Sequence, residues 1–168
     1  TPAVAKHRIF AWLEARILPD VQLVAFARAD DYFFGILQST IHELWSRRKG
    51  TQLRDAASGF RYTLTTTFET FPLPWPPGEE PTGDPRVEAV AEAARELVEK
   101  RQAWLSPPDV TGEERKKRTL TNLYNEYPTW LQIAHRKLDE AVLDAYGWPH
   151  DVDEEGILRR LLEINLER

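Results

Sequence analysis

The stretch from residue 31 to residue 77 decides the fold, and it reads DYFFGILQSTIHELWSRRKGTQLRDAASGFRYTLTTTFETFPLPWPP. Asp30 or Asp31 can cap a helix at its start, and Gly50 can end that helix after three cations that suit the negative end of its dipole. Apolar side chains recur in between at spacings of three and four, which indicates one buried helix face: Phe33, Phe34, Leu37, Ile41, Leu44 and Trp45.

The flanking segments favour strands by composition. Branched and aromatic residues are concentrated in His7 to Glu14, Val21 to Ala27 and Thr63 to Thr70, so each is predicted to form a short strand. Phe71 to Pro77 cannot continue a sheet because proline lacks the backbone donor, and an extended, polyproline-like strap is expected there.

The rest of the chain has a helical pattern. Asp84-Pro85 is a cap followed by a first-turn proline, and that helix is expected to end before Pro107. Further helices are predicted over Glu113 to Glu126, from Pro128 to Gly147, and after a cap at Asp151 or Asp153. We therefore expect an α+β fold, with a small β-containing recognition subdomain in residues 1–77 and an all-helical C-terminal region of about four helices in residues 78–168.

Composition limits the classes of function. The chain has no cysteine, which excludes disulfides and thiolate metal sites. It has no apolar run near the roughly 20 residues that cross a bilayer and no signal-peptide pattern at its start, so no membrane contact and a cytoplasmic location are expected. The absence of methionine suggests a processed piece or an excised fragment.

Charge is unevenly distributed. The whole chain is at −5, but residues 1–76 carry nine Lys/Arg against seven Asp/Glu, while the remainder carries thirteen against twenty. Between Leu44 and Tyr62 the sequence has five cationic residues and one acidic residue, Asp55, which gives a local charge of +4. Such a loop suits a polyanion, and on charge alone a solvated loop is an equally good interpretation.

No catalytic or metal motif is present. His42-Glu43 begins like a zinc-protease helix, but Ser46 stands where the second histidine ligand is required. His135 and Asp139 are four residues apart and are expected to form an ordinary surface pair. The sequence has no nucleophile elbow, P-loop or dinucleotide fingerprint, so catalysis by this chain alone is not expected. The remaining class of function is recognition of another molecule.

The basic loop contains the side chains that DNA readout uses. Arginine pairs with guanine, glutamine with adenine, and lysine, serine and threonine hold phosphates or bases. The candidate contacts are Ser46, Arg47, Arg48, Lys49, Gln52, Arg54 and Arg61.

The order of these segments resembles one family. The run YFFGILQSTIHELW, the loop, the pair Arg61-Tyr62 and the block FPLPWPP are similar to the end of the target-recognition domain in large adenine-specific DNA methyltransferases, including fused restriction–methylation enzymes of the MmeI-like type. LTNLYNEYPTWL (residues 120–131) and the tail HRKLDEAV through Tyr146-Gly147 match the same family. The resemblance covers nearly the whole chain.

The resemblance implies a parent enzyme that binds S-adenosylmethionine and methylates adenine N6 in duplex DNA after flipping the base. Its methyltransferase domain would lie N-terminal to Thr1, because the cofactor and catalytic motifs of that domain are absent from this sequence. The chain itself is then expected to hold neither cofactor nor metal. By the same resemblance, Arg47, Arg48, Lys49, Gln52 and Arg54 would contact DNA and Arg61 would hold a phosphate. Phe68, Phe71, Pro72 and Trp75 would be packing anchors.

A second hypothesis is a helical docking module that binds another domain or chain without reading DNA. The acidic tail and three tryptophans, Trp104, Trp130 and Trp148, favour it. An exposed aromatic patch would support this interpretation, whereas burial of the three rings would remove most of its support.

Overall fold

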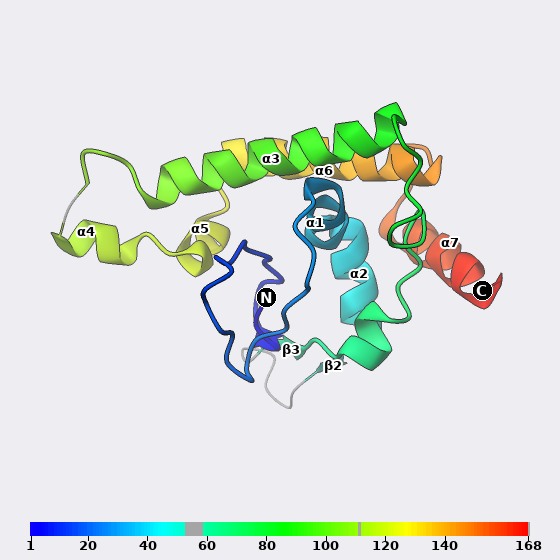
Figure 1. Ribbon diagram of the computed structural model, residues 1–168, viewed down its shortest axis with the longest axis horizontal. Helices are drawn as coiled ribbons and strands as arrows, with labels where there is room; N and C mark the ends of the chain where they lie inside the picture. Colours follow the sequence, from blue (N-terminus) through cyan, green and yellow to red (C-terminus); the bar gives the residue numbers. More distant parts are fainter. Residues whose placement is uncertain (53–58, 111, 168) are drawn as a thin grey trace.

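The computed structural model describes residues 1–52, 59–110 and 112–167, with the backbone alone for Thr51 and Gln52. Figure 1 shows α3 and α6 as a long pair along one side of the molecule, with α1, α2 and the small sheet below them. The elements are β1 (Val4–Ala5), α1 (Asp31–Gln38), α2 (Thr40–Lys49), β2 (Thr51–Gln52), β3 (Phe60–Arg61), the π-helical turn η2 (Leu64–Phe68), α3 (Pro85–Leu105), α4 (Gly112–Lys117), α5 (Leu120–Glu126), α6 (Thr129–Tyr146) and α7 (Glu154–Glu167). The expected α+β class with a helical C-terminal region is confirmed.

One hydrophobic core joins the two halves of the chain. Helix α3 packs along α6 and against α1, and α2 contacts α6 and α7. Gly35 makes the α1–α3 crossing close, since a Cβ at that position would lie 2.7 Å from Val90 Cγ1. The core cluster accordingly includes Ile36 and Trp45 from the first half together with Leu97 and Leu138 from the second.

The single helix predicted from Asp31 to Lys49 is two helices. Asp30 caps the first, as expected, by accepting a 2.8 Å hydrogen bond from the backbone N–H of Phe33. Ser39 then adopts an extended conformation, and its hydroxyl oxygen caps α2 by accepting from the backbone N–H of His42. Gly50 ends α2, so both outer boundaries are confirmed and only the internal break was missed.

The strands lie elsewhere than predicted. The sheet has the antiparallel order β1-β3-β2, with Val4 and Thr51 both paired to Arg61. The predicted strands at 7–14 and 21–27 are wrong: those residues are irregular apart from a single bridge between Pro2 and Leu23. Some apolar side chains of these segments pack against α1 and others are exposed at the surface. Strand propensity counts residue types alone, so it cannot distinguish such a segment from a strand that is hydrogen-bonded in a sheet.

The threonine-rich segment is also not a strand. Residues 64–68 form the π-helical turn η2, in which the backbone N–H of Glu69 bonds the Leu64 carbonyl. The strap after it is anchored as expected: Phe71 is buried, and Trp75 lies near the Tyr32 ring and under the Arg86 guanidinium. The β-branched side chains at 63–70 therefore led to a wrong strand prediction, while the prolines correctly marked where sheet pairing is impossible.

The helical half follows its capping signals. Asp84 caps α3 with Pro85 in its first turn, and Gly147 ends α6 in the left-handed conformation at φ 70°. Asp153 accepts from the backbone N–H of Gly156 at the start of α7. The helix predicted over 113–126 is split into α4 and α5, which are separated at Arg118 and Thr119. Among the described residues, no helix combines the length and the apolar character that a membrane span requires.

Candidate nucleic-acid interface

Four cations lie at the sheet end of α2. Arg47, Arg48 and Lys49 form its last turn, and the pairing of Thr51 with Arg61 places β3 beside the residues that follow the helix. All four side chains are exposed. We call Arg47, Arg48, Lys49 and Arg61 the basic edge. The sequence named each of these residues, and the fold brings them together through the β2–β3 pair.

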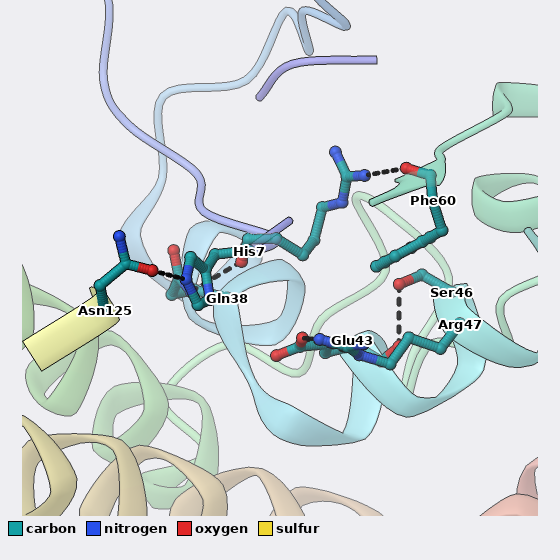
Figure 2. Close-up of polar contacts among 8 residues, drawn as sticks. His7, Gln38, Glu43, Ser46, Arg47, Phe60 and Asn125 are labelled. Atoms are coloured by element: carbon teal, nitrogen blue, oxygen red, sulfur yellow. Dashed lines mark hydrogen bonds and ion pairs between the residues drawn. The ribbon is translucent and has the colours of Figure 1, made fainter. Parts of the chain in front are cut away.

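The four cations differ in how free they are. Arg47 is paired one helical turn back with Glu43, with a Nε–Oε1 distance of 2.9 Å, and its guanidinium lies 5.1 Å from the centre of the Phe60 ring. Figure 2 shows Glu43 and Arg47 joined in this way on α2. Lys49 Nζ lies 4.9 Å from the Trp45 ring centre. Arg48 and Arg61 have no side-chain partner within the ranges that the structure describes, so they are the members best able to bind an anion.

Two of the other candidates are placed differently. Ser46 is fully buried, and its hydroxyl donates to the carbonyl of Glu43 at 2.9 Å, so it faces its own helix rather than solvent (Figure 2). Gln52 lies in β2, where the structure describes its backbone only. Arg54 lies outside the described residues.

A buried arginine fixes the inner side of the basic edge. Arg8 donates to the carbonyl of Pro2 and, at 3.3 Å, to the carbonyl of Phe60 in β3. Its guanidinium lies 4.9 Å from the ring centres of both Phe60 and Tyr62. Burial lowers the pKa of Arg8 to about 10, so it stays charged at neutral pH. The N-terminal segment is thereby bound to the strand that carries Arg61.

Sequence reasoning missed this role of Arg8, because the residue stands in a segment predicted to be a strand. The one signal is the position of Arg8 directly before the apolar pair Ile9 and Phe10, both of which are buried in the core. A buried guanidinium needs acceptors, and backbone carbonyls supply them here.

His42 belongs to the scaffold. It is fully buried, with Nδ1 2.8 Å from the Leu37 carbonyl and Nε2 3.0 Å from the Tyr62 hydroxyl. The carbonyl can only accept, so Nδ1 carries the proton and Tyr62 donates to Nε2. Burial lowers the pKa of His42 to about 4, which keeps it neutral. Both nitrogens are occupied, and the described residues contain no cluster of side chains that could hold a metal ion.

The surface pair expected between His135 and Asp139 is wrong. His135 is buried, and its Nε2 lies 2.8 Å from the Tyr124 hydroxyl. Asp139 instead accepts a 2.8 Å hydrogen bond from the backbone N–H of Thr40, the first residue of α2. Residues four apart share a helix face, but here each contacts a different neighbouring helix, and sequence spacing could not show this.

A second buried arginine ties the N-terminal segment to the helical half. Arg101 on α3 donates to the Phe10 carbonyl at 2.9 Å, to Gln38 Oε1 at 3.1 Å and to the Tyr124 hydroxyl at 3.2 Å. A further link is the 2.9 Å contact between His7 Nε2 and Asn125 Oδ1 (Figure 2). The basic edge is therefore held by the whole fold rather than by its local strands.

The three tryptophans do not form an exposed aromatic patch. Trp148 is buried and stacks on Tyr146 with ring centres 4.3 Å apart. Trp104 and Trp130 are half-buried, and both pack against the core. One of the three rings is buried and two are half-buried, so the docking hypothesis loses part of its aromatic support and keeps the acidic tail.

Comparison with known proteins agrees with the resemblance found in the sequence. The chain is 29% identical over 141 residues, 83% of its length, to DNA methyltransferase A of Bacillus subtilis (strain 168). It also matches the solved structure of the Type IIL restriction-modification enzyme MmeI in complex with DNA, with a TM-score of 0.61 and 27% identity over 83% of the chain. No family model matches. The chain spans 14% of the methyltransferase and 16% of the MmeI chain.

Proposed function

We propose that this chain is the DNA target-recognition and helical C-terminal part of an S-adenosylmethionine-dependent adenine-N6 DNA methyltransferase. The methyltransferase domain would lie N-terminal to it and would supply cofactor binding and methyl transfer. Residues 1–77 would present the DNA-contacting surface and residues 78–168 would support it. The enzyme would act on DNA in the bacterial cytoplasm.

The basic edge is the observation that carries this proposal. A net acidic chain concentrates four exposed cations at one helix end and one strand, and two of them have no described partner. Duplex DNA binds through phosphate neutralisation by Lys and Arg, with base edges read by arginine forks. Similarity to an enzyme solved in complex with DNA supports the same assignment. We assign Arg48 and Arg61 to direct DNA contact, with Arg61 and Lys49 on phosphates, and we propose DNA contact for Gln52 and Arg54 as well.

Arg47 and Ser46 have smaller roles in this proposal. Arg47 can reach DNA only by leaving Glu43, so part of its charge is already compensated. Ser46 would act indirectly, through the last turn of α2, because its hydroxyl is buried.

The test is a set of single substitutions in the full-length parent enzyme. Arg48→Ala and Arg61→Ala should each weaken binding to target duplex by about 1–3 kcal/mol and reduce methylation accordingly. Arg115→Ala is the matched control, since Arg115 is an exposed arginine on α4, which Figure 1 shows apart from β2 and β3. Equal affinity for all three variants and the wild type would refute the assignment.

A further inference from the structure

The irregular N-terminal segment exposes an unusual amount of apolar surface. Beneath it lies a hollow of 440 Å³, lined by residues 10–15, Ile17 and residues 24–28, and by Phe33, Phe34 and Leu37 of α1. Exposed apolar surface gathered in one place marks an interaction site. Of the large hydrophobic side chains that are exposed in the described chain, the N-terminal ones are Trp12, Leu13, Ile17, Leu18, Val21 and Leu23, with Leu18 at 93% and Val21 at 96%.

The rim of this hollow is the start of an unfinished ladder. Thr1 and Val24 exchange two backbone hydrogen bonds, of 3.1 and 2.8 Å, and Pro2 bridges Leu23 in the antiparallel sense. In such a ladder a hydrogen-bonded pair recurs every second residue, so the next position on this side is Phe26. The backbone N–H and C=O of Phe26 have no partner in the described part of the chain.

We infer that the edge at residues 24–27 receives an extended apolar segment in antiparallel register, and that this segment is the stretch of the parent enzyme directly before Thr1. The inference rests on the proposed function, in which the chain is part of a longer enzyme. Because the ladder already runs through Thr1, the preceding residue comes opposite Ala25, and the one before that comes opposite Phe26. The added strand satisfies the Phe26 backbone and covers the apolar hollow.

The register gives a sharp test by disulfide formation in the full-length parent. The residue before Thr1 and Ala25 would form a non-hydrogen-bonded pair, whose Cα atoms lie about 4.5 Å apart, within reach of a disulfide. Cysteine at the residue before Thr1 combined with Ala25→Cys should therefore form an intrachain disulfide under oxidised glutathione. The matched control is the same upstream cysteine with Ala27→Cys, another exposed alanine but two residues out of register.

The outcomes are separable. A disulfide with Ala25→Cys and none with Ala27→Cys supports the inference. No disulfide, equal yields at both positions, or a bond between two copies of the chain overturns it. Each variant is also assayed for DNA binding, so a fold defect is detected directly. Failure of the register with the Arg48→Ala effect intact leaves the proposed function standing.

A second measurement follows the hollow itself. Ile17 lines it and is 48% exposed, while Ile133 on α6 is equally exposed but lies outside it. In the full-length enzyme, Ile17→Lys should accelerate exchange of the Phe26 backbone amide, the one the added strand would newly bond, by about tenfold or more, and Ile133→Lys should leave it unchanged. Rapid exchange of the Phe26 amide already in the wild type would contradict the covering strand.

Discussion

The carboxylate of Asp139 on α6 caps the first residue of α2, accepting a 2.8 Å hydrogen bond from the backbone N–H of Thr40. Ser39 satisfies a second amide of the same helix end, that of His42. The helix whose last turn carries the basic edge is thus fixed at its other end by a residue 99 positions along the chain. The helical half therefore positions the proposed DNA contacts.

Removing this cap should destabilise the fold. Asp139→Ala is expected to lower the free energy of unfolding by about 1 kcal/mol, as for other N-cap losses. Burial raises the pKa of Asp139 to about 6, so Asp139→Asn, which keeps an acceptor without the buried charge, should be near wild type. Urea unfolding measures both variants, with Glu140→Ala on the exposed side of α6 as control. A loss equal for the Asn and Ala variants would show that the hydrogen bond is unimportant.

The close crossing of α1 and α3 predicts an overpacking effect. A methyl at residue 35 would approach Val90 Cγ1 to 2.7 Å, so Gly35→Ala should cost about 1–3 kcal/mol despite the better helix propensity of alanine. Val90→Ala makes room for that methyl. In a double-mutant cycle, Val90→Ala should therefore be less harmful in the Gly35→Ala background than in the wild type. If the losses of stability in the two single variants simply add in the double variant, the strain does not arise from contact between residues 35 and 90.

Two buried histidines make stability depend on pH. Burial lowers the pKa of His42 and of His135 to about 4, below the value of about 6.5 expected in the unfolded chain. Their stabilising contribution is present above pH 6.5 and is lost as pH falls toward 4, by about 2 kcal/mol for each histidine at pH 5. Asp139 opposes this, because its raised pKa favours the folded state as pH falls from 6 to 4.

The net expectation is a fall in the free energy of unfolding between pH 7 and pH 5, since two histidines outweigh one carboxyl. Urea titrations at several pH values measure it. His135→Gln should reduce the slope. A slope in this variant equal to that of the wild type would contradict the burial argument.

Breaking the hydrogen-bond network of Arg101 should lower the free energy of unfolding. Arg101→Met removes a donor to the Phe10 carbonyl, Gln38 Oε1 and the Tyr124 hydroxyl. Gln38 Oε1 still accepts from the Phe10 backbone N–H and the Tyr124 hydroxyl keeps its bond to His135, so the Phe10 carbonyl is the group left without a described partner. A buried polar group left unsatisfied costs about 1–3 kcal/mol, so a loss of that size is expected in thermal or urea unfolding. Arg115→Met at the surface should change stability by less than about 0.5 kcal/mol. Similar values for the two variants would refute the structural role of Arg101.

Local signals predicted much of this fold. The caps at Asp30, Asp84 and Asp153 and the stops at Gly50 and Gly147 stand where their chemistry indicated. The strands failed because each real strand has two residues, too short to show a period of two. At the interface, the sequence named the cations, and the spacing of Glu43 and Arg47 could have shown their pairing. The role of Arg101 could not be found, because all its partners come from distant segments.

The most direct test of the central claim is the salt dependence of DNA binding by the full-length enzyme. The logarithm of the association constant falls with the logarithm of salt concentration by about 0.9 for each phosphate neutralised. The double variant Arg48→Ala/Arg61→Ala should therefore bind more weakly with a slope shallower by about 0.9–1.8, while Arg115→Ala keeps the wild-type slope. A double variant with wild-type affinity and slope would show that the basic edge does not contact DNA.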